Sequence, residues 1–301
     1  MKQRIIATLL GCLLIGAAAA ADTTYQPFVL ASVSDAGLAE QTAATVAALE
    51  KAGFSVAGQY APVEGANVIV VTSPELQAVA AQTPKGGYGA AQRISVTERE
   101  GKTEVAFVNP VYIQHAYRLE GDMQPVYDSL KNALGESEAF GAKKKMTAKK
   151  LKKYHYMVGM QRFDDPSELG RFESYEAAVA AVEGGLAAPG DPLSLVYRID
   201  LPEKQQTVFG VGMRATGTAD SEVDIDAAHQ LAVVDFEGYS KAAYFPYEVL
   251  VDGGNVEALH MRFRMAVHFP DLSMMGKHGF MKLMASPGAT EDALRGLVAS
   301  P

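Results

Sequence analysis

Residues 257–284 read EALHMRFRMAVHFPDLSMMGKHGFMKLM and contain an unusual concentration of methionine, histidine and arginine. Along the first part of this stretch apolar and polar residues alternate, which is typical of a β-strand with one buried face. The apolar set is Met261, Phe263, Met265, Val267 and Phe269. The opposite set, which we term the polar row, is His260, Arg262, Arg264 and His268. The pattern predicts a strand over 256–269 that ends before Pro270.

The polar row has two interpretations. Arginine binds a carboxylate or a phosphate through two parallel hydrogen bonds, so a row that faces solvent suits a small anionic ligand or a protein partner. Alternatively, the row pairs with acidic residues of neighbouring strands, such as Glu248, Asp200 or Glu257, and each pair contributes about 0.2–1 kcal/mol. Ion pairing is the more common use of such a row. Ligand binding is the best functional hypothesis that the sequence offers, provided that helices cover the opposite, apolar face.

A second candidate site follows in the same stretch. Met274, His278 and Met281 recur at the spacing of one helical face, and Met275 lies beside them. Thioether and imidazole ligands suit Cu(I), so these four residues predict a copper-handling site as an alternative function. Methionine is more often a flexible filler of hydrophobic cores, and we favour that interpretation for this set. No other cofactor is expected.

The start of the chain has the pattern of a secretory signal peptide over residues 1–21. Lys2 and Arg4 precede an apolar core over 5–15, and a run of alanines ends at Ala21, near which we expect cleavage. The protein is therefore expected to be periplasmic or secreted. Leu-Leu-Gly-Cys around Cys12 also fits a lipidation signal, which is the alternative and the only route that we foresee to a stable membrane anchor.

Processing at that point sets the composition of the mature chain. It removes the single cysteine, so no disulfide is expected. It also leaves 25 basic residues against 35 acidic ones, a net charge of −10, which disfavours nucleic acid as a partner. The remaining length suggests about two domains. The oligomeric state does not follow from the sequence.

Both halves of the chain predict the same order of elements, namely strand, helix, about four strands and helix. In the first half we expect strands over 27–35, 54–62, 66–72 and 93–108, the last being a hairpin, and helices over 37–53, 75–82 and 122–135. In the second half we expect strands over 154–163, 193–201, 206–213, 244–252 and 256–269, and helices over 174–186, in the Met/His segment and over 291–298.

The repeated order predicts an α+β protein made of two tandem two-layer β-α-β4-α domains. In each, helices cover one face of a mostly antiparallel sheet, because central strands are apolar throughout while outer strands alternate. We place the first domain at 22–138, a Lys-rich linker at 139–153 and the second domain at 154–301. The two sheets either pair with each other or lie side by side.

The first half also resembles a known bacterial family over residues 32–135. The segments TVAALEKAGF and NVIVVTSPELQAVAA, and a strand that ends in Asn109-Pro110, are similar to those of domain-of-unknown-function family 302. The resemblance implies a two-layer β-α-β4-α fold, in agreement with the order above. It carries no catalytic residue to any position of this chain, and the second half departs further from the pattern.

The Lys-rich segment reads FGAKKKMTAKKLKKY over 140–154. One interpretation is a patch for an anionic surface, such as lipid headgroups. The other, which we favour, is a solvated and helical linker, because charge runs of this kind repel one another into solvent.

Sequence motifs of catalysis are absent. The string GVGMRA over 210–215 lacks a following helix that could hold a pyrophosphate, and the acidic residues over 220–226 lack the turn glycine of a calcium loop. The chain contains no GxSxG and no HExxH. We therefore name no catalytic residue and favour a non-catalytic binding module, while an enzyme with an unrecognised site stays a third possibility.

Overall fold

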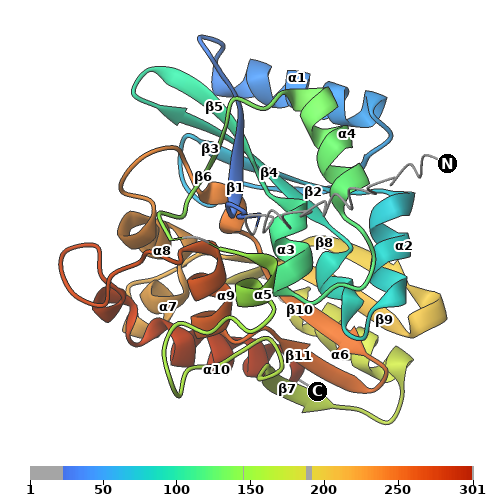
Figure 1. The fold of residues 1–301 in the computed structure, drawn as a ribbon. Helices are drawn as coiled ribbons and strands as arrows, with labels where there is room; N and C mark the ends of the chain where they lie inside the picture. Colours follow the sequence, from blue (N-terminus) through green and yellow to red (C-terminus); the bar gives the residue numbers. More distant parts are fainter. Residues whose placement is uncertain (1–22, 145, 188–191, 300–301) are drawn as a thin grey trace, which may run out of the picture.

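Two antiparallel sheets, one in each half of the chain, organise the fold (Figure 1). The computed structural model describes residues 23–144, 146–187 and 192–299. The expected signal peptide with Cys12 lies outside the described residues. The protein is an α+β molecule of two sheet-plus-helix units, as the repeated order of elements predicts. Among the described residues no helix has the length and apolar character needed to span a bilayer.

The first sheet has six strands in the order β2-β3-β4-β5-β1-β6. They are β1 (Phe28–Ser34), β2 (Ser55–Tyr60), β3 (Ala66–Thr72), β4 (Gln92–Arg99), β5 (Lys102–Val108) and β6 (Glu138–Phe140). The central strand β3 is apolar and buried on both faces, as its sequence predicts. Glu100 and Gly101 join β4 to β5, and both have positive φ, which gives the turn the twist that a two-residue hairpin needs.

Helices α1 (Leu38–Lys51) and α4 (Gln124–Leu134) cover one face of this sheet. Two further helices begin at side-chain caps. Ser73 accepts the amide hydrogen of Leu76 at the start of α2 (Pro74–Gln82), and Asn109 accepts those of Val111 and Tyr112 at the start of α3 (Pro110–Ala116). Proline stands at the first position of both helices, where its missing N–H is not needed.

The second sheet has five strands in the order β7-β11-β10-β9-β8. They are β7 (Ser167–Arg171), β8 (Leu193–Leu201), β9 (Gln206–Met213), β10 (Tyr247–Asp252) and β11 (Asn255–Ala258). Helices α6 (Tyr175–Leu186) and α10 (Ser286–Ala299) cover one face of it. Between β9 and β10 the chain forms α7 (Asp220–Ile225) and α8 (Ala227–Val234).

The two sheets share one topology. When β7 is matched with β1, and β8–β11 with β2–β5, the order of the five strands is identical. Even the irregularities match, because β1 and β7 each bulge once, at Ala31 and Leu169, and β2 and β8 each bulge once, at Ala57 and Val196. Bulges are specific features of a strand rather than defects, so their repetition confirms that both halves have the same design.

Each half covers the free face of the other sheet. The turn η1 (Gly86–Gly89), which precedes β4, packs on β9 and β10. In the equivalent place the turn η3 (Ala242–Tyr244), which precedes β10, packs on β3, β4 and β5. The edge strands β2 and β8 also meet, so closely that a Cβ on Gly58 would collide with the carbonyl oxygen of Val196. One continuous hydrophobic core therefore runs through both halves.

The prediction of a strand over 256–269 is wrong beyond Ala258. Residues Met261–His268 form the helix α9, which begins where the Nδ1 atom of His260 accepts the amide hydrogen of Arg262. Two polar members of the alternating pattern, Arg264 and His268, are buried together with the apolar ones, so the alternation does not separate an exposed face from a buried one. A helix buried on nearly all sides has no period that distinguishes it from a strand.

Two smaller expectations also differ from the structure. The predicted strand over 154–163 is irregular, and the first strand of the second half is β7, which begins at Ser167. Among its described residues, the Lys-rich segment forms the short helix α5 (Ala148–Leu151), and before it β6 pairs with β1 of the first sheet. The domain limits that we expected from sequence remain predictions.

Candidate functional site

The polar row does not form a surface. Arg264 and His268 have no exposed side-chain area, His260 caps α9, and Arg262 is half-buried beside Tyr156. The prediction that these residues line the uncovered face of a sheet is wrong. Its physical cause is the helix, which turns successive polar residues by about 100° instead of aligning alternate ones on one side.

Arg264 is held inside the core by backbone and aromatic groups. Its Nη2 atom donates to the carbonyl oxygens of Tyr244 and Pro246, both at 2.7 Å. The guanidinium carbon lies 4.3 Å from the ring centroid of Tyr244 and 4.8 Å from that of Tyr247, so two rings contact the cation. Its Nε atom lies 3.6 Å from Glu248 Oε2. All of these partners of the Arg264 guanidinium lie inside the protein, so this charge does not face a ligand in solvent.

Glu248 and His268 complete this buried cluster. Arg93 Nη1 lies 3.0 Å from Glu248 Oε2, and the hydroxyl of Tyr197 donates to the same carboxylate at 3.1 Å. His268 donates from Nδ1 to the carbonyl oxygen of Arg264 at 2.8 Å, so its Nε2 accepts from Arg93 at 3.1 Å. Burial, together with Arg93 and Arg264, holds the pKa of His268 well below its usual range.

The other two acidic residues proposed as partners of the polar row have partners elsewhere. Asp200 pairs with Arg198 at 2.8 Å, and Glu257 pairs with Lys85 at 2.7 Å. Burial raises the pKa of Glu257, although Lys85 acts in the opposite direction. Of the three acidic residues that the sequence suggested, Glu248 is the one that meets a member of the row, through Arg264.

The Met/His segment is irregular over 274–279 and then enters the 3-10 helix η4 (Phe280–Leu283), which contains Met281. Met275 is 71% exposed and Met281 is 48% exposed, so the expectation that both pack in the core is wrong. Met274 does pack against the core, and the ring of His278 stacks on Phe236 with centroids 4.1 Å apart. Gly276 has a φ of +101°, which a regular helix does not allow. Hydrogen bonds from the amides of residues 280 and 281 to the carbonyl oxygens of 273 and 274 close the loop at its neck.

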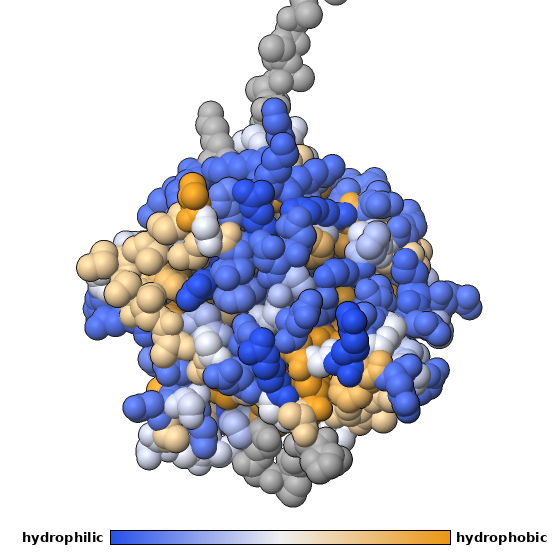
Figure 2. Space-filling view, turned by 90° about the horizontal axis from the view of Figure 1, so that it is seen from below, coloured by the Kyte–Doolittle hydropathy of each residue, from blue (hydrophilic) through white to orange (hydrophobic). Residues whose placement is uncertain are grey.

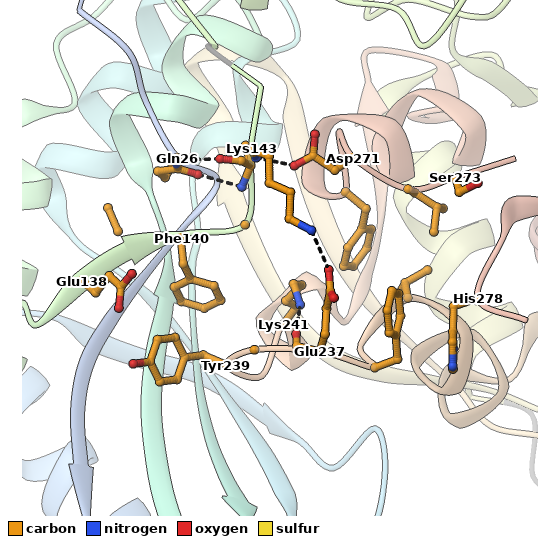
Figure 3. Close-up of a pocket in the computed structure, with 18 of the residues that line it drawn as sticks. Gln26, Glu138, Phe140, Lys143, Glu237, Tyr239, Lys241, Asp271, Ser273 and His278 are labelled. Atoms are coloured by element: carbon orange, nitrogen blue, oxygen red, sulfur yellow. Dashed lines mark hydrogen bonds and ion pairs between the residues drawn. The ribbon is translucent and has the colours of Figure 1, made fainter. Parts of the chain in front are cut away.

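This loop forms one wall of an open groove of about 750 Å³ (Figure 3). The other walls come from residues 138–143, which include β6, and from residues 234–241, which follow α8. Gln26 lies at the edge, where it exchanges two hydrogen bonds with the backbone of Ala142. The groove thus lies between a segment of the first half and two segments of the second.

Aromatic rings form much of the groove surface. Phe140 and Tyr239, one from each half, meet edge to face with centroids 5.4 Å apart. Phe140 also stacks on Phe28 of β1 at 5.6 Å, which anchors it to the sheet. Phe236 is 47% exposed and presents its ring beside His278. An apolar or aromatic body therefore finds rings on two sides of the groove.

One ion pair spans the groove between the halves. Figure 3 shows the side chain of Lys143 extending to Glu237, and the Nζ and Oε1 atoms lie 3.2 Å apart. Both side chains are largely exposed. The backbone N–H of Lys143 donates to Asp271, and Lys241 Nζ donates to the carbonyl oxygen of Glu237 at 2.8 Å. Burial lowers the pKa of Lys241, while Asp235 acts against that shift.

Comparisons with protein-family models, with curated proteins and with solved structures found no match to this chain. The groove is therefore interpreted from its own chemistry. Within the described residues, histidine, cysteine and carboxylate side chains nowhere gather in groups of three or more that could hold a metal ion.

Sequence analysis identified one wall of the groove and missed the others. Met275 and His278 belong to the stretch singled out above, but Phe140, Glu237 and Tyr239 carried no local signal. Phe140 is separated from Glu237 and Tyr239 by about a hundred residues, and two strands and a helix lie between Tyr239 and the Met/His segment, so only the tertiary packing brings these segments together.

Proposed function

We propose that this protein is a non-catalytic binding protein that holds a small amphiphilic ligand in the groove between its halves. The ligand has an aromatic or flat apolar body and an anionic group. The observation that carries the proposal is the exposed Lys143–Glu237 pair, which spans a groove with aromatic walls. The anionic ligand expected from the sequence is kept, but Lys143 replaces Arg262 and Arg264 as the group that recognises its charge.

The size and composition of the groove support this function. Small-molecule sites have volumes of roughly 300–1,000 Å³, with mainly apolar walls and a few polar groups that fix orientation. The groove, at about 750 Å³, lies within that range. Phe140, Phe236 and Tyr239 supply the apolar walls, and Lys143 supplies an ammonium group at their edge.

The ion pair is weak enough for a ligand to replace. Exposed pairs contribute about 0–1 kcal/mol, because water competes for both charges. A carboxylate, sulfonate or phosphate can thus take the place of Glu237 against Lys143 at small cost. The buried acid–base groups His268 and Glu248 do not line the groove, whereas Glu237, Asp271 and His278 do.

Two fluorescent dyes test this proposal. Anilinonaphthalene sulfonate has an aromatic body and an anionic group, whereas N-phenylnaphthylamine has a similar body without charge. We expect Lys143→Met to weaken binding of the sulfonate several-fold and to leave the neutral dye nearly unchanged. Glu237→Gln should strengthen binding of the sulfonate, and Phe236→Ala should weaken both dyes. The matched control is Lys51→Met, on the exposed side of α1. If both dyes bind all of these variants equally, the groove is not the site.

A copper-handling function is the second proposal, supported by the neck of the Met/His loop. The hydrogen bond from Met281 N to the carbonyl oxygen of Met274, at 3.0 Å, brings these two residues side by side, and Met275 and His278 line the same groove. Soft thioether and imidazole ligands favour Cu(I). Titration with Cu(I) under reducing conditions, against a competing chelator, should show binding that Met275→Leu together with Met281→Leu weakens.

Met157→Leu is the control for that titration, because Met157 is also exposed but lies on a different loop. Binding no tighter than micromolar in the unmodified protein removes the copper proposal.

A further inference from the structure

The Lys-rich segment forms a cationic surface that we term the lysine face. Its members are Lys144, Lys149, Lys150, Lys152 and Lys153, and all of them are exposed. Two of the nearby acidic groups are already paired, Glu237 with Lys143 and Asp164 with Arg118, and a third, Asp165, accepts the amide hydrogen of Arg162. Within the part of the chain that the structure describes, Lys149, Lys152 and Lys153 form no ion pair. The lysine face therefore stays positive in a chain whose net charge is negative.

The lysine face is built on a fixed support. Thr147 caps α5 by accepting the amide hydrogen of Lys150, and Leu151 is buried beneath the helix. Met146 is also buried, and its carbonyl oxygen accepts the amide hydrogen of Tyr25 at 2.9 Å. α5 packs on α3 of the first half. Because the apolar side chains point inward, the lysines of this short helix point into solvent. A free linker would not hold its lysines on one side in this way.

An apolar projection follows directly after the lysines. Val158 is 95% exposed and Met157 is 44% exposed, next to Gly159, which has a φ of +84°. A valine at the tip of a turn gains nothing within the fold from such exposure. In Figure 1 this loop lies in the front of the molecule, just below α5.

The lysines and the projection share one continuous surface. A hollow of about 590 Å³ is lined by Lys149, Lys150 and Lys153 together with the rings of His155 and Tyr156. His155 also lines the neighbouring hollow that Val158 borders. Lys144 Nζ lies 5.9 Å from the centroid of the Tyr156 ring. Cationic groups, aromatic rings at their base and an exposed aliphatic tip thus lie together.

We propose that the lysine face binds the surface of an anionic phospholipid bilayer, with Val158 and Met157 inserted among the lipids. Clusters of four or more basic residues attract anionic headgroups, and an apolar residue beside them adds burial at the boundary of the acyl chains. Charge attraction alone would suit any polyanion. The apolar tip distinguishes a bilayer, because a phosphate in solution or a nucleic-acid backbone offers no hydrocarbon for it.

The rest of the surface fixes the orientation. The chain is acidic overall, so the other faces are repelled by an anionic membrane, and the positive face is turned toward it. Figure 2 shows hydrophilic residues over much of the side seen from below, with hydrophobic ones in separate groups. Binding of this kind is peripheral and reversible.

Vesicle flotation with the mature chain tests the proposal. We expect binding to vesicles of equal parts phosphatidylglycerol and phosphatidylcholine, little binding to phosphatidylcholine alone, and release at about 0.5 M salt, where screening acts within a few Å. Lys149→Gln, Lys152→Gln and Lys153→Gln together should weaken binding by about fivefold per charge removed. Val158→Ser should weaken it several-fold without changing the net charge.

The matched control is the triple variant Lys51→Gln, Lys204→Gln and Lys282→Gln, which removes the same charge elsewhere on the surface. It should retain most of the binding. Equal binding to neutral and anionic vesicles overturns the proposal, as does full binding by the lysine-face variant. Binding that Val158→Ser leaves intact, together with equally tight binding of a DNA duplex, identifies a general polyanion surface instead of a membrane one.

Discussion

Arg93 and Glu248 occupy the same position in the two halves and form an ion pair with each other. Each is the second residue of its strand, β4 and β10, and each pairs with the fifth residue of the preceding strand, Val70 and Gly210. Their Nη1 and Oε2 atoms lie 3.0 Å apart, and both side chains are buried. Two identical residues could not form this contact, because like charges would repel. The halves therefore share a topology but need different residues where they meet.

The first prediction concerns the charge of Glu248. Glu248→Gln leaves Arg93 and Arg264 close together without the carboxylate between them. We expect a loss of about 3–5 kcal/mol in the free energy of unfolding, the usual effect of breaking a buried pair. Urea unfolding at neutral pH measures it. Asp35→Asn, in the exposed pair with Lys102, is the control and should cost less than about 1 kcal/mol. Equal losses in the two variants would contradict this account.

The second prediction concerns pH and His268. Its folded pKa lies well below the usual value because of burial and the adjacent Arg93 and Arg264, with Glu248 as the nearby carboxylate. The unfolded chain takes up a proton below about pH 6.5 and the folded protein does not, so stability is retained above that pH and falls below it. Between pH 7.5 and 5.5 the single group accounts for about 1.4 kcal/mol.

Between pH 7.5 and 5.5 the unmodified protein should therefore lose about 1.4 kcal/mol more of its free energy of unfolding than His268→Gln does. Urea unfolding at both pH values measures this difference. His155→Gln, which alters a ring at the surface, serves as the comparison. A His268→Gln variant with an unchanged pH dependence would refute the assignment.

The third prediction uses two adjacent glycines of α6. A Cβ on Gly185 would collide with the backbone carbonyl of Leu297 in α10, whereas a Cβ on Gly184 has no atom within 4 Å. Alanine is the better helix former by up to about 1 kcal/mol. Gly184→Ala should thus raise the thermal midpoint. Gly185→Ala should lower it, because pushing α10 away costs about 1–3 kcal/mol in the free energy of unfolding. The order would be reversed or absent if the helices did not touch.

The fourth prediction concerns oxidation of methionine. Met275, Met281, Met284 and Met157 are the exposed methionines among the described residues, while Met213, Met261 and Met265 are buried. Peroxide converts accessible thioethers to sulfoxides first. Peptide mass spectrometry after brief peroxide treatment should find the exposed set modified and the buried set intact. In Figure 1 the loop after α9 projects on the left side of the molecule. Protection of Met275 would mean that the Met/His segment is packed after all.

Much of the fold was predictable because each element buries one side. The helix expected over 37–53 is α1 (Leu38–Lys51), and the hairpin expected over 93–108 is β4 and β5. The repeated order of elements predicted the shared topology of the two sheets. The resemblance to family 302 remains a prediction. The prediction from hydrophobic periodicity was wrong at α9, because apolar and charged residues are buried there together and the helix has no fully exposed side.

The candidate site was predictable only in part. The sequence marked the Met/His segment as unusual, and the structure places it on the groove. Lys143 belonged to the Lys-rich segment, but nothing near it in the chain indicated Glu237 or Tyr239 as neighbours. Residues that act together across the two halves leave no local pattern, because the sequence near each residue reflects the structure of its own segment and not the segment that packs against it.

The sequence by itself determined most strands of the two sheets, the helices that cover them and the duplication of that arrangement, since these depend on the local period of hydrophobicity. Only the tertiary structure decided that Arg264 and His268 lie inside, that Lys143 meets Glu237, and that Val158 projects beside the lysines. The reason is physical. Whether a charged residue faces water or a partner depends on which part of the other half covers it, and that contact joins residues far apart in the chain.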